Sequence, residues 1–220
     1  MFKGLIRVFA AVGLLASAFA SPAAAETLRG VGFGDSLMAG YQLPPGAGFP
    51  DQLERALREE GYDVSIADAG LSGDTTAGGL SRLHWSVPDG TDFVILELGG
   101  NDALRGLPPE VTRDNLDRMI TRLKARGIDV LLAGIRAPPN MGADYRDRFD
   151  AIFADLADKH DVPLYPFFLD GAITINADGE AVREKMMADG IHPTAEGVAA
   201  MVERFMPLMR DYLSRKGMER

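Results

Sequence analysis

The chain has 220 residues, of which 46% are hydrophobic and 25% charged, and its 32 acidic side chains against 23 basic ones give a formal net charge of −9. This composition is typical of an ordinary globular protein and excludes collagen-like, coiled-coil and wholly disordered chains. Because the chain has no cysteine and only three histidines, without a paired-histidine motif, we expect no thiolate nucleophile and no metal site.

Residues 1–25 differ in character from the rest of the chain. Lys3 and Arg7 precede an apolar run at 8–20, and small residues follow up to Ala25. This pattern predicts a signal peptide removed after Ala25, and therefore a periplasmic or secreted protein. The run is shorter than the roughly 20 apolar residues that cross a bilayer, so we expect no stable membrane anchor. Removal leaves 21 basic against 32 acidic residues, and a formal charge of −11 disfavours nucleic acid or an anionic membrane as a partner.

Short apolar runs alternate with amphipathic segments along the rest of the chain. The runs predict strands at residues 28–34, 64–69, 93–98, 130–135 and, more briefly, 162–165. Apolar residues at helical spacing lie between and after them: Leu53, Ala56 and Leu57; Leu116, Met119, Ile120 and Leu123; Tyr145, Phe149, Ile152, Phe153 and Leu156; and Val198, Met201, Val202 and Phe205. We expect Pro207 to kink or end the last of these helices.

Apolar strands separated by amphipathic helices predict a doubly wound α/β fold, with a parallel sheet covered on both faces. No linker or charge block divides residues 26–220, so we expect one domain. In this architecture the loops after the carboxyl ends of the strands build the functional site.

Three of these loops hold residues suited to chemistry. Ser36 follows the first strand, where a serine at the start of a helix presents its hydroxyl and its N–H to a ligand; the alternative is a simple helix cap. The loop from Ala69 to Thr76 is rich in small residues whose amides can point into open space. Asn101 follows the third strand and can donate through its side-chain amide, or form only an Asx turn.

The C-terminal region adds a histidine with a carboxylate close by. Asp189 stands three residues before His192, and Gly190 allows a tight turn, so the carboxylate can orient the imidazole. Taken alone, the pair is also compatible with an ordinary surface histidine. We expect His84 and His160, which lack this context of a carboxylate three residues before and a turn glycine, to lie at the surface or in core packing.

Taken together, four segments resemble the SGNH (GDSL-type) hydrolase family, and within it the bacterial periplasmic thioesterase, lysophospholipase and arylesterase group. In chain order they are Gly34-Asp35-Ser36-Leu37, Ser72-Gly73-Asp74-Thr75, Gly99-Gly100-Asn101-Asp102 and Asp189-Gly190-Ile191-His192-Pro193. The resemblance implies a flavodoxin-like three-layer α/β/α sandwich with a mostly parallel five-stranded sheet. It also implies that Ser36 is the nucleophile, His192 the base and Asp189 its support, with Ser36, Gly73 and Asn101 as the oxyanion hole.

The implied activity is a serine esterase that hydrolyses aryl or short-chain alkyl esters, or lysophospholipids, through an acyl-enzyme and without a cofactor. Leu104 and Leu107 would contact the acyl chain, in a segment that Gly106 allows to move; the alternative is a plain connection to the next helix. Met38 departs from the small polar residue common in the family, which concerns substrate preference.

Three other readings stay open. A thioesterase of the same family would use the same residues, although an exported enzyme with a −11 surface is poorly suited to acyl-CoA. A lipid- or carbohydrate-binding module would keep the fold without chemistry. A dinucleotide-binding domain is disfavoured because Leu37 stands where the third glycine of the fingerprint belongs.

Overall fold

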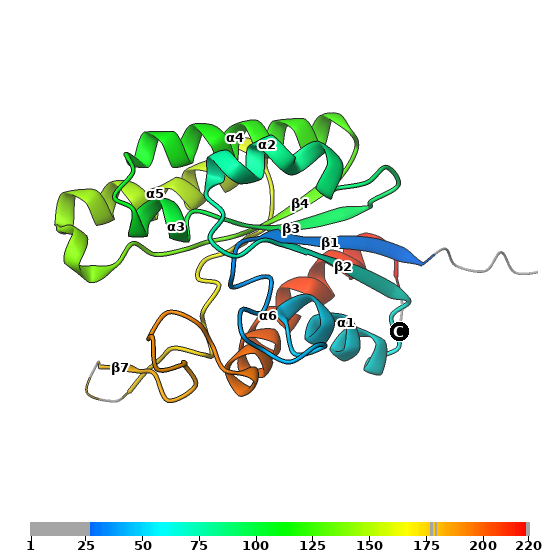
Figure 1. Cartoon of the computed structure of the whole chain (residues 1–220). Helices are drawn as coiled ribbons and strands as arrows, with labels where there is room; N and C mark the ends of the chain where they lie inside the picture. Colours follow the sequence, from blue (N-terminus) through cyan, green and yellow to red (C-terminus); the bar gives the residue numbers. More distant parts are fainter. Residues whose placement is uncertain (1–26, 177, 179, 219–220) are drawn as a thin grey trace, which may run out of the picture.

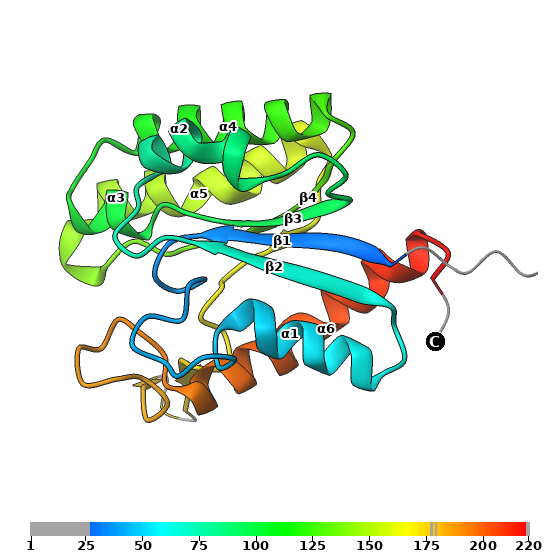
Figure 2. The ribbon, with the colours of Figure 1, turned by 45° about the vertical axis from the view of Figure 1, so that its right-hand side comes forward.

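The computed structural model describes residues 27–176, 178 and 180–218, in which a β-sheet lies between two layers of helices (Figure 1 and Figure 2). The predicted signal peptide falls outside the described residues. The strands are β1 (Leu28–Gly34), β2 (Val64–Gly70), β3 (Phe93–Glu97), β4 (Asp129–Ala133), β5 (Leu164–Tyr165), β6 (Thr174–Ile175) and β7 (Ala181–Val182). The helices are α1 (Phe49–Glu59), α2 (Thr76–Ser86), α3 (Gly100–Leu104), α4 (Pro109–Ala125), α5 (Ala143–His160) and α6 (Ala195–Arg215), with a short 3₁₀ turn η1 (Pro139–Met141).

The main sheet has the strand order β2-β1-β3-β4-β5, and every neighbouring pair is parallel. The predicted α/β fold with a five-stranded parallel sheet is therefore confirmed. β1 pairs with β2 on one side and with β3 on the other, with Gly34 opposite Gly70 and Phe33 opposite Leu96. Because the three strands end at the same level, the loops that follow them meet at one edge of the sheet.

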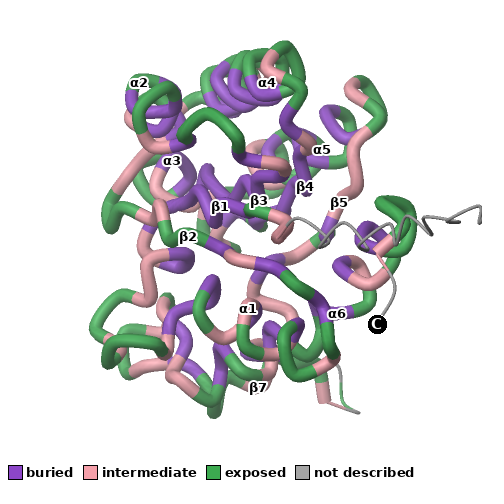
Figure 3. Tube along the Cα trace, turned by 90° about the vertical axis from the view of Figure 1, so that its right-hand side faces the viewer, coloured by how far each residue is buried: buried purple, intermediate pink, exposed green. Residues whose placement is uncertain are grey.

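Helices cover both faces of the sheet. α1 and α6 lie together on one face, and α2, α4 and α5 cover the other, while α3 sits at the edge where the strands end (Figure 1). β3 is buried along its whole length, as the tube coloured by burial shows (Figure 3). Because both faces of β3 are buried, its sequence is a continuous apolar run. Among the described residues, no helix combines the length and apolar character needed to cross a bilayer.

Some elements are not foreseen by the apolar pattern, α2 above all. Its inner face includes Gly79, where an added Cβ would lie 2.3 Å from Leu98 Cδ1, and the buried Arg82, so it shows no regular apolar stripe. The short hairpin of β6 and β7 is likewise unforeseen. The expectation that Pro207 could end the last helix is wrong, since α6 continues through it to Arg215.

Candidate active site

Ser36, Gly73 and Asn101 follow the carboxyl ends of β1, β2 and β3 respectively. Ser36 is in a turn directly after β1, and α1 begins only at Phe49, so neither the predicted helix start nor a helix cap at this serine is correct. Asn101 is in the first turn of α3. From the sequence we expect residues 103–108 to form a mobile loop, but α3 extends to Leu104, so part of this segment is helical. α4 begins at Pro109, as expected for the alternative of a plain connection to the next helix.

A chain of two short contacts joins Ser36 to the C-terminal region. His192 Nε2 lies 2.8 Å from Ser36 Oγ, and His192 Nδ1 lies 2.7 Å from Asp189 Oδ2. The serine and the histidine are 156 residues apart in sequence. With Nδ1–H donating to the carboxylate, Nε2 is left to accept the hydroxyl proton, which is the arrangement that activates a serine.

Asp189 is held in its ionised form by several donors. Its contact with the His192 side chain, followed by the backbone N–H groups of His192 and Ile191 at 3.0 and 2.9 Å, lowers the pKa of this carboxyl to about 2. Gly190, at φ +68°, makes the turn that lets both amides reach one oxygen. The carboxylate therefore stays charged across the whole working pH range and fixes the imidazole's orientation.

Tyr41 also contacts the imidazole of His192. Its ring lies against that of His192, with centroids 4.5 Å apart, and its backbone N–H donates to the Ser36 carbonyl at 3.1 Å. On the other side, the His192 carbonyl accepts from the Met187 N–H at 2.7 Å, and Thr194 caps α6 immediately afterwards. The histidine is thus anchored to the turn after β1 and to a long helix.

A cavity of about 190 Å³ opens beside these residues. Its polar lining comes from Ser36, Gly73, Asn101 and His192, and its apolar lining includes Leu104, which is 51% exposed. The three predicted oxyanion donors, among them the predicted nucleophile Ser36, therefore line one cavity. Its other lining residues are Asp35, Leu37, Tyr41, Ser72, Gly100 and Ile191.

Two of the three predicted oxyanion donors, Asn101 and Gly73, are fixed by hydrogen bonds to neighbouring residues. Asn101 Nδ2 donates to Asp35 Oδ2 at 2.9 Å, which fixes the amide and leaves its second N–H for a ligand. Gly73 has φ +82°, and a Cβ there would meet nothing within 4 Å, so its backbone borders open space. Its carbonyl accepts from Arg105 Nη2 at 2.8 Å, which ties this loop to the end of α3.

A buried polar network joins the starts of α2 and α3 and was not foreseen from the sequence. Asp102 is fully buried and accepts from the Thr76 N–H at 2.8 Å and from Thr76 Oγ1 at 2.5 Å. Thr112 Oγ1 donates to the same carboxylate at 3.3 Å, and Asn115 donates to Thr76 Oγ1 at 3.1 Å. Asp102 follows the candidate donor Asn101 directly, and a carboxylate beside Asn101 is the only trace of the network in the sequence.

Two acidic side chains, Asp35 and Glu97, lie next to the turn that holds Ser36. Asp35 accepts from the Leu37 N–H at 3.0 Å, and Glu97 Oε2 accepts from the Asp35 N–H at 3.3 Å. Burial raises the pKa of Asp35 to about 6 and, together with the charge of Asp35, raises the pKa of Glu97 well above its ordinary value of 4.5. Glu97 Oε1 is buried and makes no hydrogen bond within the described residues. Burying Glu97 costs less free energy when the carboxyl is neutral than when it is charged, so we infer that Glu97 is protonated.

Other residues singled out in the sequence lie apart from the cavity. Leu107 does not line it, and Met38 is fully buried in the core. His84 is exposed on α2, and His160 Nε2 pairs with Asp117 Oδ1 at 2.5 Å between α5 and α4.

Among the described residues, no three potential metal ligands come together. A larger cavity of about 360 Å³, between α4 and α5, contains none of the predicted site residues.

Comparison with known proteins relates this chain to a family of hydrolases. Residues 33–200 match the model of the GDSL-like Lipase/Acylhydrolase family. The chain is 42% identical to an arylesterase of Vibrio mimicus over 193 residues, which are 87% of this chain and 92% of the relative. It is 35% identical to thioesterase 1/protease 1/lysophospholipase L1 of Escherichia coli over 195 residues, or 88% and 84% of the two chains. The crystal structure of AlinE4, an SGNH-hydrolase family esterase, is 44% identical with a TM-score of 0.69, covering 86% of this chain and 97% of that one.

The buried Glu97 leads to a prediction about stability and pH. Above pH 4.5 the unfolded chain releases this proton while the folded chain keeps it, so the free energy of unfolding falls as pH rises toward the folded-state pKa. Glu97→Gln removes this loss without changing the shape of the side chain. Its free energy of unfolding should therefore increase relative to the original chain, by up to about 1.4 kcal/mol per pH unit in that range.

Urea unfolding at several pH values between 4.5 and 8 measures this difference. The exposed Glu59→Gln on α1 is the matched control and should show a small, nearly constant difference. A Glu97→Gln difference that stays constant or shrinks as pH rises would contradict a neutral Glu97.

Proposed function

This chain belongs to the GDSL-like Lipase/Acylhydrolase family and is a carboxylic ester hydrolase, and on this premise we propose that it acts through an acyl-enzyme formed on Ser36. The observation that carries the proposal is the contact chain from Ser36 Oγ through His192 to Asp189, at 2.8 and 2.7 Å, beside a cavity. A non-catalytic binding module would not require that alignment.

In the proposed mechanism, His192 Nε2 takes the hydroxyl proton as Ser36 Oγ attacks the acyl carbonyl. The oxygen of the tetrahedral intermediate accepts hydrogen bonds from the N–H groups of Ser36 and Gly73 and from the Asn101 amide. The imidazolium, whose charge Asp189 balances, then protonates the departing alcohol. Water attacks the acyl-enzyme, gives its proton to His192 and releases the acid, which restores Ser36.

We propose small aryl or alkyl esters and lysophospholipids as substrates. The apolar side of the cavity, with Leu104 and Ile191 partly exposed, suits a hydrocarbon chain, and its volume of about 190 Å³ suits a small acyl group. The name of the Escherichia coli relative favours thioesters as a second candidate class, since the same steps release a thiol. Rates on an ester and a thioester of one acyl chain distinguish the two.

We further propose that the mature enzyme begins at Glu26 and works in the periplasm or outside the cell. The proposal rests on the basic and apolar pattern of residues 1–25. A formal charge of −11 on the mature chain fits a small-molecule substrate better than a nucleic acid.

Ser36→Ala tests the nucleophile. Without the hydroxyl no acyl-enzyme forms, so kcat for p-nitrophenyl acetate should fall about 10⁴- to 10⁶-fold, with the melting temperature nearly unchanged. Ser81→Ala, an exposed serine of α2, is the matched control and should keep its rate. Near-normal turnover by folded Ser36→Ala would refute the assignment.

Leu104→Ala tests the acyl side of the cavity. Because Leu104 lines the cavity, its truncation removes apolar contact from long acyl chains and little from acetate. We expect kcat/KM to fall about 10-fold on an octanoyl ester and less than twofold on an acetyl ester. Val111→Ala, exposed on α4 outside the lining, should affect neither. Equal losses at both chain lengths would count against this subsite.

A further inference from the structure

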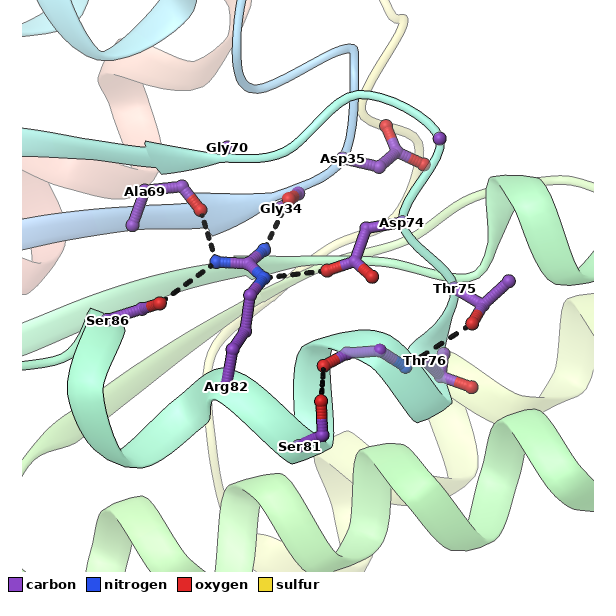
Figure 4. Close-up of polar contacts among 12 residues, drawn as sticks. Gly34, Asp35, Ala69, Gly70, Asp74, Thr75, Thr76, Ser81, Arg82 and Ser86 are labelled. Carbon is purple, nitrogen blue, oxygen red and sulfur yellow. Dashed lines mark hydrogen bonds and ion pairs between the residues drawn. The ribbon is translucent and has the colours of Figure 1, made fainter.

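Arg82 is a charged side chain that the structure buries almost completely, with 8% of the residue exposed. Its guanidinium makes four hydrogen bonds, all of which are drawn as dashed lines in Figure 4. Nε donates to Asp74 Oδ2 at 2.7 Å, Nη1 to the Ala69 carbonyl at 2.8 Å, and Nη2 to the Gly34 carbonyl at 2.8 Å. Nη1 also lies 3.3 Å from Ser86 Oγ.

These partners belong to the segments that carry the proposed chemistry. Gly34 ends β1, two residues before Ser36, and Ala69 is the next-to-last residue of β2. Asp74 follows Gly73 directly. One side chain from α2 therefore bonds both the strand that presents the nucleophile and the loop that presents an oxyanion donor.

Two further observations show that the sequence accommodates this contact. The guanidinium carbon lies 4.0 Å from the centre of the Phe33 ring, so the group is stacked as well as hydrogen-bonded. At Gly78, an added Cβ would lie 1.9 Å from Asp74 Oδ1. The first turn of α2 thus has a glycine where the Asp74 carboxylate needs room.

We propose that Arg82 is a positioning residue, which fixes the Gly73 loop relative to Ser36 so that the oxyanion donors face the same point. This inference rests on the proposed function. Arginine suits the task because its planar fork sends N–H groups in fixed directions to several acceptors, whereas lysine offers one point charge. Stability alone is a weaker explanation, since a buried ion pair often adds little over apolar packing.

The proposal predicts a loss of rate without a loss of substrate binding. Arg82→Lys keeps the charge beside Asp74 but cannot hold both strand-end carbonyls as well, so the Gly73 loop shifts relative to Ser36. Since a displacement of about 1 Å can cost 10²-fold in rate, we expect kcat to fall 10- to 100-fold with KM within threefold. Affinity for an alkyl boronic acid, which forms a tetrahedral adduct on the serine, should fall with kcat/KM, while affinity for the product carboxylate should not.

The matched control is Arg210→Lys, since Arg210 makes a similar two-pronged pair with Glu60 and neither residue lines the cavity. It should leave kcat and boronic acid affinity unchanged. Asp74→Asn is the second variant, because it keeps the shape of the side chain and should fold even if Arg82→Lys does not. It should lower kcat about three- to tenfold, since an amide holds the guanidinium less firmly than a carboxylate does.

Folding is checked by the melting temperature, and rates are compared at a temperature where every variant is fully folded. If folded Arg82→Lys or, should that variant not fold, Asp74→Asn has the original kcat and boronic acid affinity, the inference is overturned. An equal loss of affinity for both inhibitors would overturn it as well, because it would indicate general loosening of the site. If Ser36→Ala abolishes turnover in the same assay, such a failure concerns Arg82 and leaves the proposed function standing.

Discussion

Parallel pairing of β1 with both of its neighbours is the constraint from which the site follows. Because Gly34 lies opposite Gly70 and Phe33 opposite Leu96, the strands β1, β2 and β3 end together. The next residues of each chain segment are then forced into the same small volume at the edge of the sheet. His192 and its partner Asp189 come from elsewhere in the chain, and the turn before α6 carries the histidine to Ser36 Oγ.

Polar groups buried behind the loops convert this rough proximity into a defined geometry. Asp102 joins the starts of α2 and α3, and Arg82 joins the ends of β1 and β2 to the Gly73 loop. Asp35 supports the Asn101 amide, while Glu97 supports the Asp35 backbone. Buried polar groups cost free energy unless they are paired, and here nearly all of them are. These groups lie behind the loops of the proposed active site, where the exact positions of atoms would decide the reaction rate.

The sequence predicts those parts of the molecule that depend on local pattern. Continuous apolar runs mark the five strands, and regular apolar spacing marks α1, α4, α5 and α6. The sequence does not predict α2, because Gly79 and Arg82 interrupt the apolar pattern of its inner face. The contacts that require these two residues are with Leu98 and Gly34, in other segments of the chain. Likewise, the motifs indicate Ser36, Asn101 and His192, whereas the contacts of Asp102 with Thr76 appear only once the strands are in register.

The central claim is that Ser36 Oγ is the nucleophile that forms the acyl-enzyme. Covalent labelling tests this claim most directly. Diethyl p-nitrophenyl phosphate phosphorylates an activated serine and releases p-nitrophenol, so inactivation, dye release and adduct formation can be followed together. The account predicts one adduct per chain, located by peptide mass spectrometry on Ser36, with one equivalent of p-nitrophenol released as activity disappears. An adduct on another residue, or complete inactivation with Ser36 unmodified, would contradict it.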